Sequence, residues 1–167
     1  MGKKLIMKAE TGLNLRKITS TEELRACESF WDDLWQRSEV NCPRSRAHLL
    51  ALWVERFAGN ESFEAYVIEQ SDGKFVAAMP VVYSTFKKIF SIARLATSYE
   101  VYGGDLLLDR DCETQKVLDC LVTVLINSSY SFLRFDRIAY QEHRWQEFFS
   151  ALERANVPVD CRHNFLI

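Results

Sequence analysis

The sequence feature that most restricts the fold is a pair of strand-like segments in the middle of the chain. Residues 63–70 (FEAYVIEQ) and 74–85 (KFVAAMPVVYST) combine a two-residue hydrophobic period with β-branched and aromatic side chains. Between them, Asp72-Gly73 supplies the positive φ of a tight two-residue turn. The sequence therefore predicts an antiparallel hairpin. Because Pro80 has no amide to donate, we expect a bulge or an unpaired edge at its position in the second strand.

Segments with helical periodicity lie on both sides of this hairpin. Ser20 and Glu23 form a capping box that starts a first helix, predicted to end near Ser38. Asp111 is placed to cap a later helix. In chain order, the sequences of the second, third and fourth predicted helices are SRAHLLALWVERFAG, CETQKVLDCLVTVLIN and EHRWQEFFSALERAN.

The remaining segments are predicted to be short strands, and together they define the fold class. These are residues 12–18, SIARLAT leading into VYGGDLLLD, residues 131–138, and an extended segment from Pro158 onward. The predicted order is β-α-α-β-β-β-α-β-α-β. It indicates an α+β fold in which helices cover both faces of a mixed, mainly antiparallel sheet. Towards the C-terminus strands and helices alternate, as they do in α/β proteins. The length of 167 residues suits one domain spanning residues 1–167.

Composition excludes several classes of function. The formal net charge is -2, so the chain lacks the basic excess of nucleic-acid binding proteins. No apolar segment approaches the ~18 residues of a membrane-spanning helix. The five cysteines are an odd number without a C-x-x-C motif, which favours reduced thiols and a cytoplasmic protein.

The element order resembles the GNAT acyltransferase fold without its final strand. Three sequences, FWDDLWQRSEVNCPRSRAHLLALWVERF, GKFVAAMPVVY and YGGDLLLD, are similar to motifs in the first half of the CelD/BcsL-type acetyltransferase family. The matching positions include Gly73, Pro80 and Asp105, whereas Arg46 and His48 replace the usual Pro and Trp.

This resemblance implies a chemistry and a partner. The family members resemble two GNAT-like domains in tandem and transfer an acyl group from acetyl-CoA or another acyl-CoA to an amine or hydroxyl acceptor. The chain would correspond to the first domain, and its partner would be a second GNAT-like domain or a second copy of itself. The missing final strand leaves an open sheet edge, which favours such pairing.

In GNAT enzymes the coenzyme pyrophosphate binds amides at a helix N-terminus, in a glycine-containing loop. The equivalent segment here, LLLDRDCET, has no glycine and carries Asp109, Asp111 and Glu113 around Arg110. Those carboxylates would repel a diphosphate. Gly103 and Gly104 lie too early in the sequence to reach the helix and are expected to bend the chain between two strands. We therefore expect no cofactor in this half of the family's architecture.

The best candidate site residues lie around this glycine pair. Tyr99, Tyr102 and Asp105 are predicted to bind a small-molecule acceptor in a groove at the centre of the sheet, with Glu100 as a possible general base. The alternative is a connecting loop in which Asp105 only satisfies nearby amides.

Other reactive side chains carry weaker hypotheses. The three histidines have no partners at metal-ligand spacing, so no metal site is predicted. Cys112 and Cys120 are expected in or beside the core. A basic cluster of Lys87, Lys88 and Arg94 could attract an anionic substrate, although a solvated turn is the simpler reading.

Two functions remain open from the sequence. The first is an acyltransferase-family domain that contributes the acceptor side of a cleft, in which case the isolated chain need not be active. The second is a non-catalytic binding or dimerisation domain of the same fold.

Overall fold

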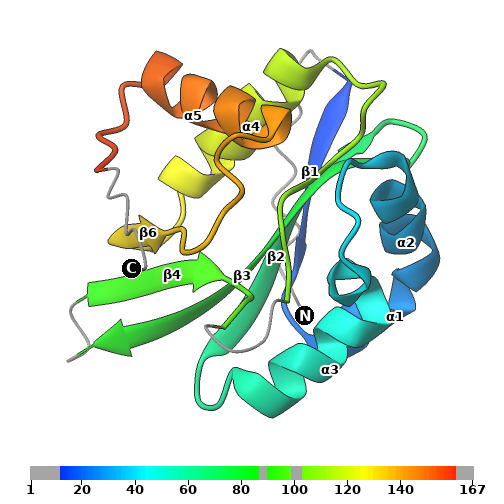
Figure 1. The fold of residues 1–167 in the computed structure, drawn as a ribbon, viewed down its shortest axis with the longest axis vertical. Helices are drawn as coiled ribbons and strands as arrows, with labels where there is room; N and C mark the ends of the chain where they lie inside the picture. The colour runs from blue at the N-terminus through cyan, green and yellow to red at the C-terminus, as the bar shows by residue number, and fades with distance from the viewer. Residues whose placement is uncertain (1–11, 87–89, 99–102, 161–167) are drawn as a thin grey trace.

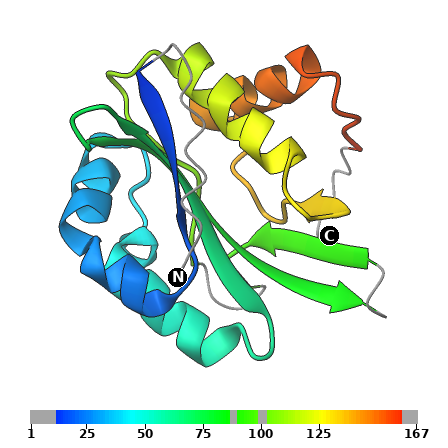
Figure 2. The ribbon, with the colours of Figure 1, turned by 180° about the vertical axis from the view of Figure 1, so that it is seen from behind.

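The computed structural model describes residues 12–86, 90–98 and 103–160. One sheet lies between two layers of helices, with α1, α2 and α3 on one face and α4 and α5 on the other (Figures 1 and 2). The elements in chain order are β1 (Leu13–Ile18), α1 (Thr21–Ala26), α2 (Glu28–Arg37), η1 (a 3₁₀ turn, Pro43–Ser45), α3 (Ala47–Phe57), β2 (Ser62–Gln70), β3 (Phe75–Phe86), β4 (Phe90–Leu95), β5 (Leu107–Leu108), α4 (Thr114–Ile126), β6 (Phe132–Arg134) and α5 (His143–Arg154).

The sheet is mixed and mainly antiparallel, as predicted. Its strand order is β1-β2-β3-β4-β6, and β5 pairs with β3 beside this path. The β4–β6 pairing is parallel, whereas the other described pairings are antiparallel. Helices cover both faces, so the predicted α+β class is confirmed.

Two hydrophobic cores fill the space between the sheet and its helical layers. One core packs α1, α2 and α3 around Trp31, Leu50 and Trp53. The other packs α4 and α5 around Leu121, Trp145 and their neighbours. In each layer the apolar side chains recur every three or four residues, which places them on one face of the helix.

The predicted strand pair forms, but its turn differs from the prediction. The Gln70 amide donates to the Lys74 carbonyl at 2.8 Å and the Gly73 amide donates to the Gln70 carbonyl at 2.9 Å. These bonds enclose a three-residue loop, Ser71 to Gly73, with Gly73 at φ 86°. The two-residue turn was therefore wrong, although glycine supplies the positive φ as expected.

Pro80 lies where the strands beside β3 are interrupted. On that side, β4 pairs with the second half of β3 and β5 pairs with Ala77 and Ala78. The Pro80 carbonyl accepts from the Ala96 amide at 3.0 Å. Because the nitrogen and carbonyl of a strand residue face the same side, the missing donor faces the interruption. The donor side of Pro80 therefore meets an interruption, as expected of an unpaired edge, whereas the bulge in the β2–β3 pairing lies elsewhere, between Ile68 and Glu69.

Several predicted boundaries were wrong. The first helix is divided at Cys27, whose φ of -109° and ψ of 20° depart from helical values. The helix predicted from Cys112 begins at Thr114, and its N-cap is Glu113 without a side-chain hydrogen bond, so Asp111 does not cap it. The strand predicted over 131–138 is limited to β6, and residues 158–160 are not a strand.

Candidate functional site

Of the four predicted site residues, the structure describes Asp105; Tyr99, Glu100 and Tyr102 lie outside the described residues. The Asp105 carboxylate accepts hydrogen bonds from Arg144 Nη2 at 2.8 Å, Trp145 Nε1 at 3.1 Å and the Leu106 amide at 2.7 Å. Asp105 therefore ties the segment before β5 to the first turn of α5. Its role in binding a substrate remains a prediction.

Arg144 is a buried cation with incomplete compensation. Its side chain is 7% exposed, and Nη1 lies 3.6 Å from a carboxylate oxygen of Glu142. Its Nε atom is buried and has no hydrogen-bond partner. A buried guanidinium is unfavourable unless it is paired, so Arg144 depends strongly on Asp105.

Gly103 and Gly104 are buried between the sheet and α3. The Gly104 amide donates to the Ala96 carbonyl at 2.7 Å, and the Gly103 amide donates to Thr97 Oγ1 at 3.1 Å. A Cβ atom on Gly103 would lie 2.1 Å from the Ala96 oxygen, and one on Gly104 would lie 2.3 Å from Pro80 Cγ. The glycine pair therefore allows close packing, and both amides are already used.

The segment immediately before α4 uses its amides in the protein's own hydrogen bonds. Four consecutive amides donate internally: Asp109 to the Val76 carbonyl at 2.9 Å, Arg110 to the Arg37 carbonyl at 3.2 Å, Asp111 to Asp109 Oδ1 at 3.1 Å and Cys112 to the Asp109 carbonyl at 3.4 Å. A phosphate would have to displace these bonds before it could reach the amides of this segment.

Asp109 itself is not one of the repelling surface charges that the sequence suggested. Its side chain is 1% exposed and forms ion pairs with Arg37 and with Lys74, the latter at 3.1 Å. The two cations neutralise it, so the repulsion attributed to Asp109 was wrong. Asp111 and Glu113 are exposed, as that argument requires. The amides from Asp109 to Cys112 are already used within the protein, and whether a diphosphate binds at this helix stays a prediction.

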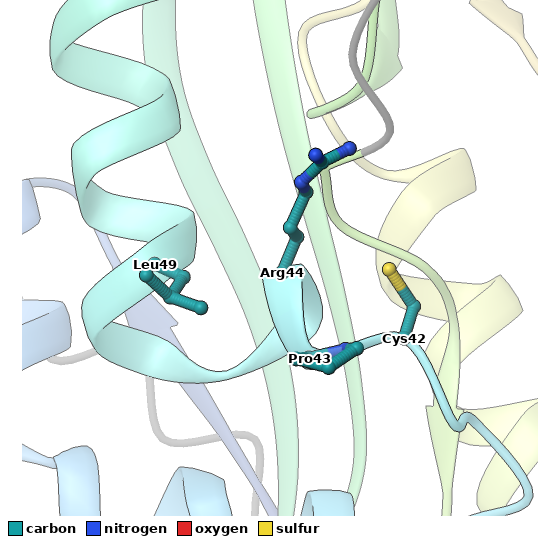
Figure 3. Close-up of a pocket in the computed structure, with 4 residues that line it drawn as sticks. All are labelled: Cys42, Pro43, Arg44 and Leu49. Atoms are coloured by element: carbon teal, nitrogen blue, oxygen red, sulfur yellow. The ribbon is translucent and has the colours of Figure 1, made fainter.

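An open, mainly apolar pocket of about 600 Å³ lies at the start of α3 and is lined by Cys42, Pro43, Arg44 and Leu49. Figure 3 shows Arg44 extending from η1 between Leu49 and Cys42. The following residue connects this pocket to the glycine pair, because Ser45 Oγ donates to the Gly103 carbonyl at 3.1 Å. The pocket therefore has a fixed position relative to the chain that leads to Asp105.

Of the other sequence candidates, Arg94 lies beside the glycine pair, because it donates to the carbonyl of Thr97, whose hydroxyl accepts from the Gly103 amide. Burial raises the pKa of the Cys112 and Cys120 thiols, which keeps them protonated and agrees with the expected boundary positions. Arg94 is paired with Glu61 and lies over the Trp53 ring, whereas Lys87 and Lys88 lie outside the described residues. Within the described ranges, no group of three or more His, Cys, Asp or Glu side chains could hold a metal.

Sequence reasoning missed a polar network beneath α4. Glu64 pairs with Lys17 at 2.8 Å and accepts hydrogen bonds from the hydroxyls of Tyr66, at 2.8 Å, and Tyr130. The one signal in the sequence is that Glu64 and Tyr66 share a face of an otherwise apolar strand. Tyr130 follows 64 residues after Tyr66, so periodicity could not reveal it.

The environment of this network fixes its protonation. Burial alone would raise the pKa of Glu64, but hydrogen bonds from Lys17, Tyr130 and Tyr66 outweigh it, and the pKa lies below its usual value. Burial raises the pKa of Tyr66 and Tyr130, so both hydroxyls remain donors at neutral pH. The network is a structural anchor for the connection between α4 and β6.

In the part of the chain that the structure describes, no helix is both long and apolar enough to cross a bilayer.

Comparison with known proteins shows the fold. No family model matches the sequence, and no curated protein shows significant sequence similarity. Among solved structures, a possible acetyltransferase from Clostridium difficile 630 has a TM-score of 0.54 and 9% identity, over 93% of this chain and 95% of that chain. A ribosomal-protein-alanine N-acetyltransferase from Brucella melitensis biovar Abortus 2308 has a TM-score of 0.51 and 11% identity, over 92% of this chain and 97% of that chain. The chain therefore has a GNAT-like fold.

Proposed function

We propose that this chain is a GNAT-fold, acyltransferase-family domain of the CelD/BcsL type that supplies the acceptor side of a cleft and does not itself hold acetyl-CoA at α4. A second GNAT-like domain, or a second copy, would complete the cleft. The reaction of the complete assembly would be acyl transfer from a CoA thioester to an amine or hydroxyl of a small-molecule acceptor.

The observation that carries this proposal is the state of the α4 entrance. Its amides from Asp109 to Cys112 donate to protein acceptors, and the buried Asp109 carboxylate already occupies the position beside Arg37 and Lys74. An incoming diphosphate would have to displace these bonds and would also meet the exposed carboxylate of Asp111, whereas Glu113 is paired with Lys116.

The acceptor surface in this proposal is formed by the pocket at η1 and the chain that leads to Asp105. The pocket offers an apolar lining and one exposed guanidinium, that of Arg44. The hydrogen bond between Ser45 and Gly103 holds it beside this segment. Tyr99 and Tyr102 remain predicted contacts, and Glu100 remains the predicted general base.

Calorimetric titration with acetyl-CoA tests the proposal. We expect no binding heat at millimolar coenzyme, because the amides from Asp109 to Cys112 beside the helix start are occupied. Binding in the micromolar range would contradict the proposed division of roles.

A pair of variants would locate any binding that did occur. Gln115→Glu adds a negative charge to the exposed first turn of α4, and Ile126→Glu adds the same charge at the other end of that helix. A coenzyme at the α4 entrance would lose about fivefold in affinity with the first variant and little with the second, given ~1 kcal/mol for charges about 4 Å apart in water. That result would show that α4 is the coenzyme site.

A non-catalytic binding or dimerisation domain is the second candidate. It is favoured by an uncovered apolar region on the sheet, where Ile92 is 40% and Phe132 is 60% exposed. An acyl-transfer assay of the full protein with its partner separates the candidates, since only the first predicts turnover.

A further inference from the structure

The η1 turn beside the apolar pocket is fixed at both of its ends. We call the pocket lined by Cys42, Pro43, Arg44 and Leu49 the η1 pocket. Just before the turn, Trp35 Nε1 donates to the Cys42 carbonyl at 3.1 Å. At its last residue, Trp31 Nε1 donates to the Ser45 carbonyl at 2.8 Å. Trp31 is fully buried and Trp35 packs against the same core. The backbone that carries Arg44 is therefore tied to the core, although the Arg44 side chain is exposed.

Arg44 differs from its neighbour Arg46 in having no partner among the described residues. Arg46 Nη2 lies 2.6 Å from Asp32 Oδ2, and the Arg46 guanidinium carbon lies 5.5 Å from the centroid of the Trp35 ring. In contrast, no hydrogen bond, ion pair or ring contact joins the Arg44 guanidinium to residues 12–86, 90–98 or 103–160. The other three lining residues of the η1 pocket are uncharged. The pocket therefore combines an apolar lining with one positive charge that the described part of the chain does not neutralise.

This combination favours a particular class of ligand. The pocket volume of about 600 Å³ is in the range of small-molecule sites, roughly 300–1,000 Å³. The planar guanidinium of Arg44 matches the two oxygens of a carboxylate. One arginine balances the single charge of a carboxylate, whereas a phosphate monoester carries about -1.5 to -2 at neutral pH. None of the four lining residues is acidic, so the pocket offers nothing to pair with an amine.

We propose that the η1 pocket binds a small amphipathic carboxylate, with its charged group at Arg44 and its apolar body against Pro43 and Leu49 (Figure 3). The assignment rests on the proposed function and deepens it, because this molecule would be the acceptor. The acceptor would then be an apolar carboxylic acid that also carries the amine or hydroxyl to be acylated.

A chemical-shift titration of the ¹⁵N-labelled full chain with octanoate tests the ligand class. The amide signals of Arg44 and Leu49 should shift and saturate, with a Kd on the order of 1–10 mM for a ligand of about ten non-hydrogen atoms. Octylamine has the same chain and a positive charge at neutral pH, and it should bind at least about fivefold more weakly. Acetate keeps the carboxylate without the apolar body and should bind at least about tenfold more weakly.

Two matched variants test the role of the cation. Arg44→Gln should weaken octanoate binding about fivefold and abolish the preference for octanoate over octylamine, because the charge that distinguishes them is gone. Arg56→Gln makes the same change at an exposed arginine in the last turn of α3, outside the pocket lining. It should leave the Kd for octanoate within about twofold.

Three outcomes would overturn the inference: no saturating shift at Arg44 and Leu49, equal affinity for octanoate and octylamine, or equal weakening by the two variants. The titration contains no coenzyme, so each of these outcomes overturns the ligand class alone. Binding of acetyl-CoA at α4 would instead contradict the proposed division of roles and would leave the octanoate titration unchanged.

Discussion

The segment before α4 and the first turn of α5 each contribute to a buried ion pair, but the buried partner carries the opposite charge in the two pairs. At α4 the buried group is a carboxylate, Asp109, with donors from Arg37, Lys74 and the Asp111 amide. At α5 the buried group is a cation, Arg144, with one close acceptor, Asp105, and an unpartnered Nε. The first is a closed structural unit. The second relies mainly on Asp105, because its other carboxylate, Glu142, lies 3.6 Å from Arg144 and is half exposed.

The largest effect is expected from Asp109→Asn. The change removes the carboxylate that Arg37 and Lys74 share. It should lower the free energy of unfolding by about 3 kcal/mol, which is at the low end for breaking a buried ion pair because both cations are partly exposed. Urea unfolding measures it. The exposed neighbour variant Asp111→Asn should change stability by less than about 0.5 kcal/mol. If both variants changed the free energy of unfolding equally, the ion pairs of Asp109 with Arg37 and Lys74 would not be the source of the stabilisation.

Asp105→Asn is expected to lower the free energy of unfolding by a smaller amount, about 2 kcal/mol. The variant loses a hydrogen bond between charged groups while the Arg144 guanidinium remains buried. Arg144→Met should lower the free energy of unfolding by less, under about 1 kcal/mol. Asp105 still accepts hydrogen bonds from Trp145 and the Leu106 amide, and its side chain is 27% exposed. Chemical denaturation of both single variants and the double variant gives the coupling energy. A greater loss from Arg144→Met than from Asp105→Asn would reverse the proposed dependence.

The smallest effect concerns Glu64, which lies away from both helix entrances. Its pKa in the folded protein is below the ordinary value, so its ionised form stabilises the fold. That contribution is present above the unfolded pKa of about 4.3 and is lost as pH falls through the lower folded value. Urea unfolding between neutral and acidic pH should show a shallower acid-side decline for Glu64→Gln than for the wild type. An unchanged decline would remove Glu64 from the account of acid stability.

Local patterns were sufficient to predict most of the fold. The hairpin and the amphipathic helices follow from side-chain period and from Gly73, because these depend on neighbours in the sequence. The division of the first helix at Cys27 has no such signal. Nor does the separation of β4 from β5, which depends on Gly103 and Gly104 packing against distant residues.

The site was less predictable because its partners are remote in sequence. Asp109 was interpreted as a surface charge, yet its partner Arg37 is 72 residues away. Asp105 was predicted to bind a substrate, which stays a prediction, and its partner in α5 is 39 residues away. A sequence shows which residues carry charge, whereas the fold determines which charges meet.

Because β4 and β5 both pair with β3, the peptide between them leaves and rejoins the sheet on a single rigid support. The end of this peptide is itself part of the fold, because Gly103 and Gly104 pack closely against Ala96 and Pro80 and Asp105 pairs with Arg144. A substitution there therefore alters the packing of the sheet and of α5 together.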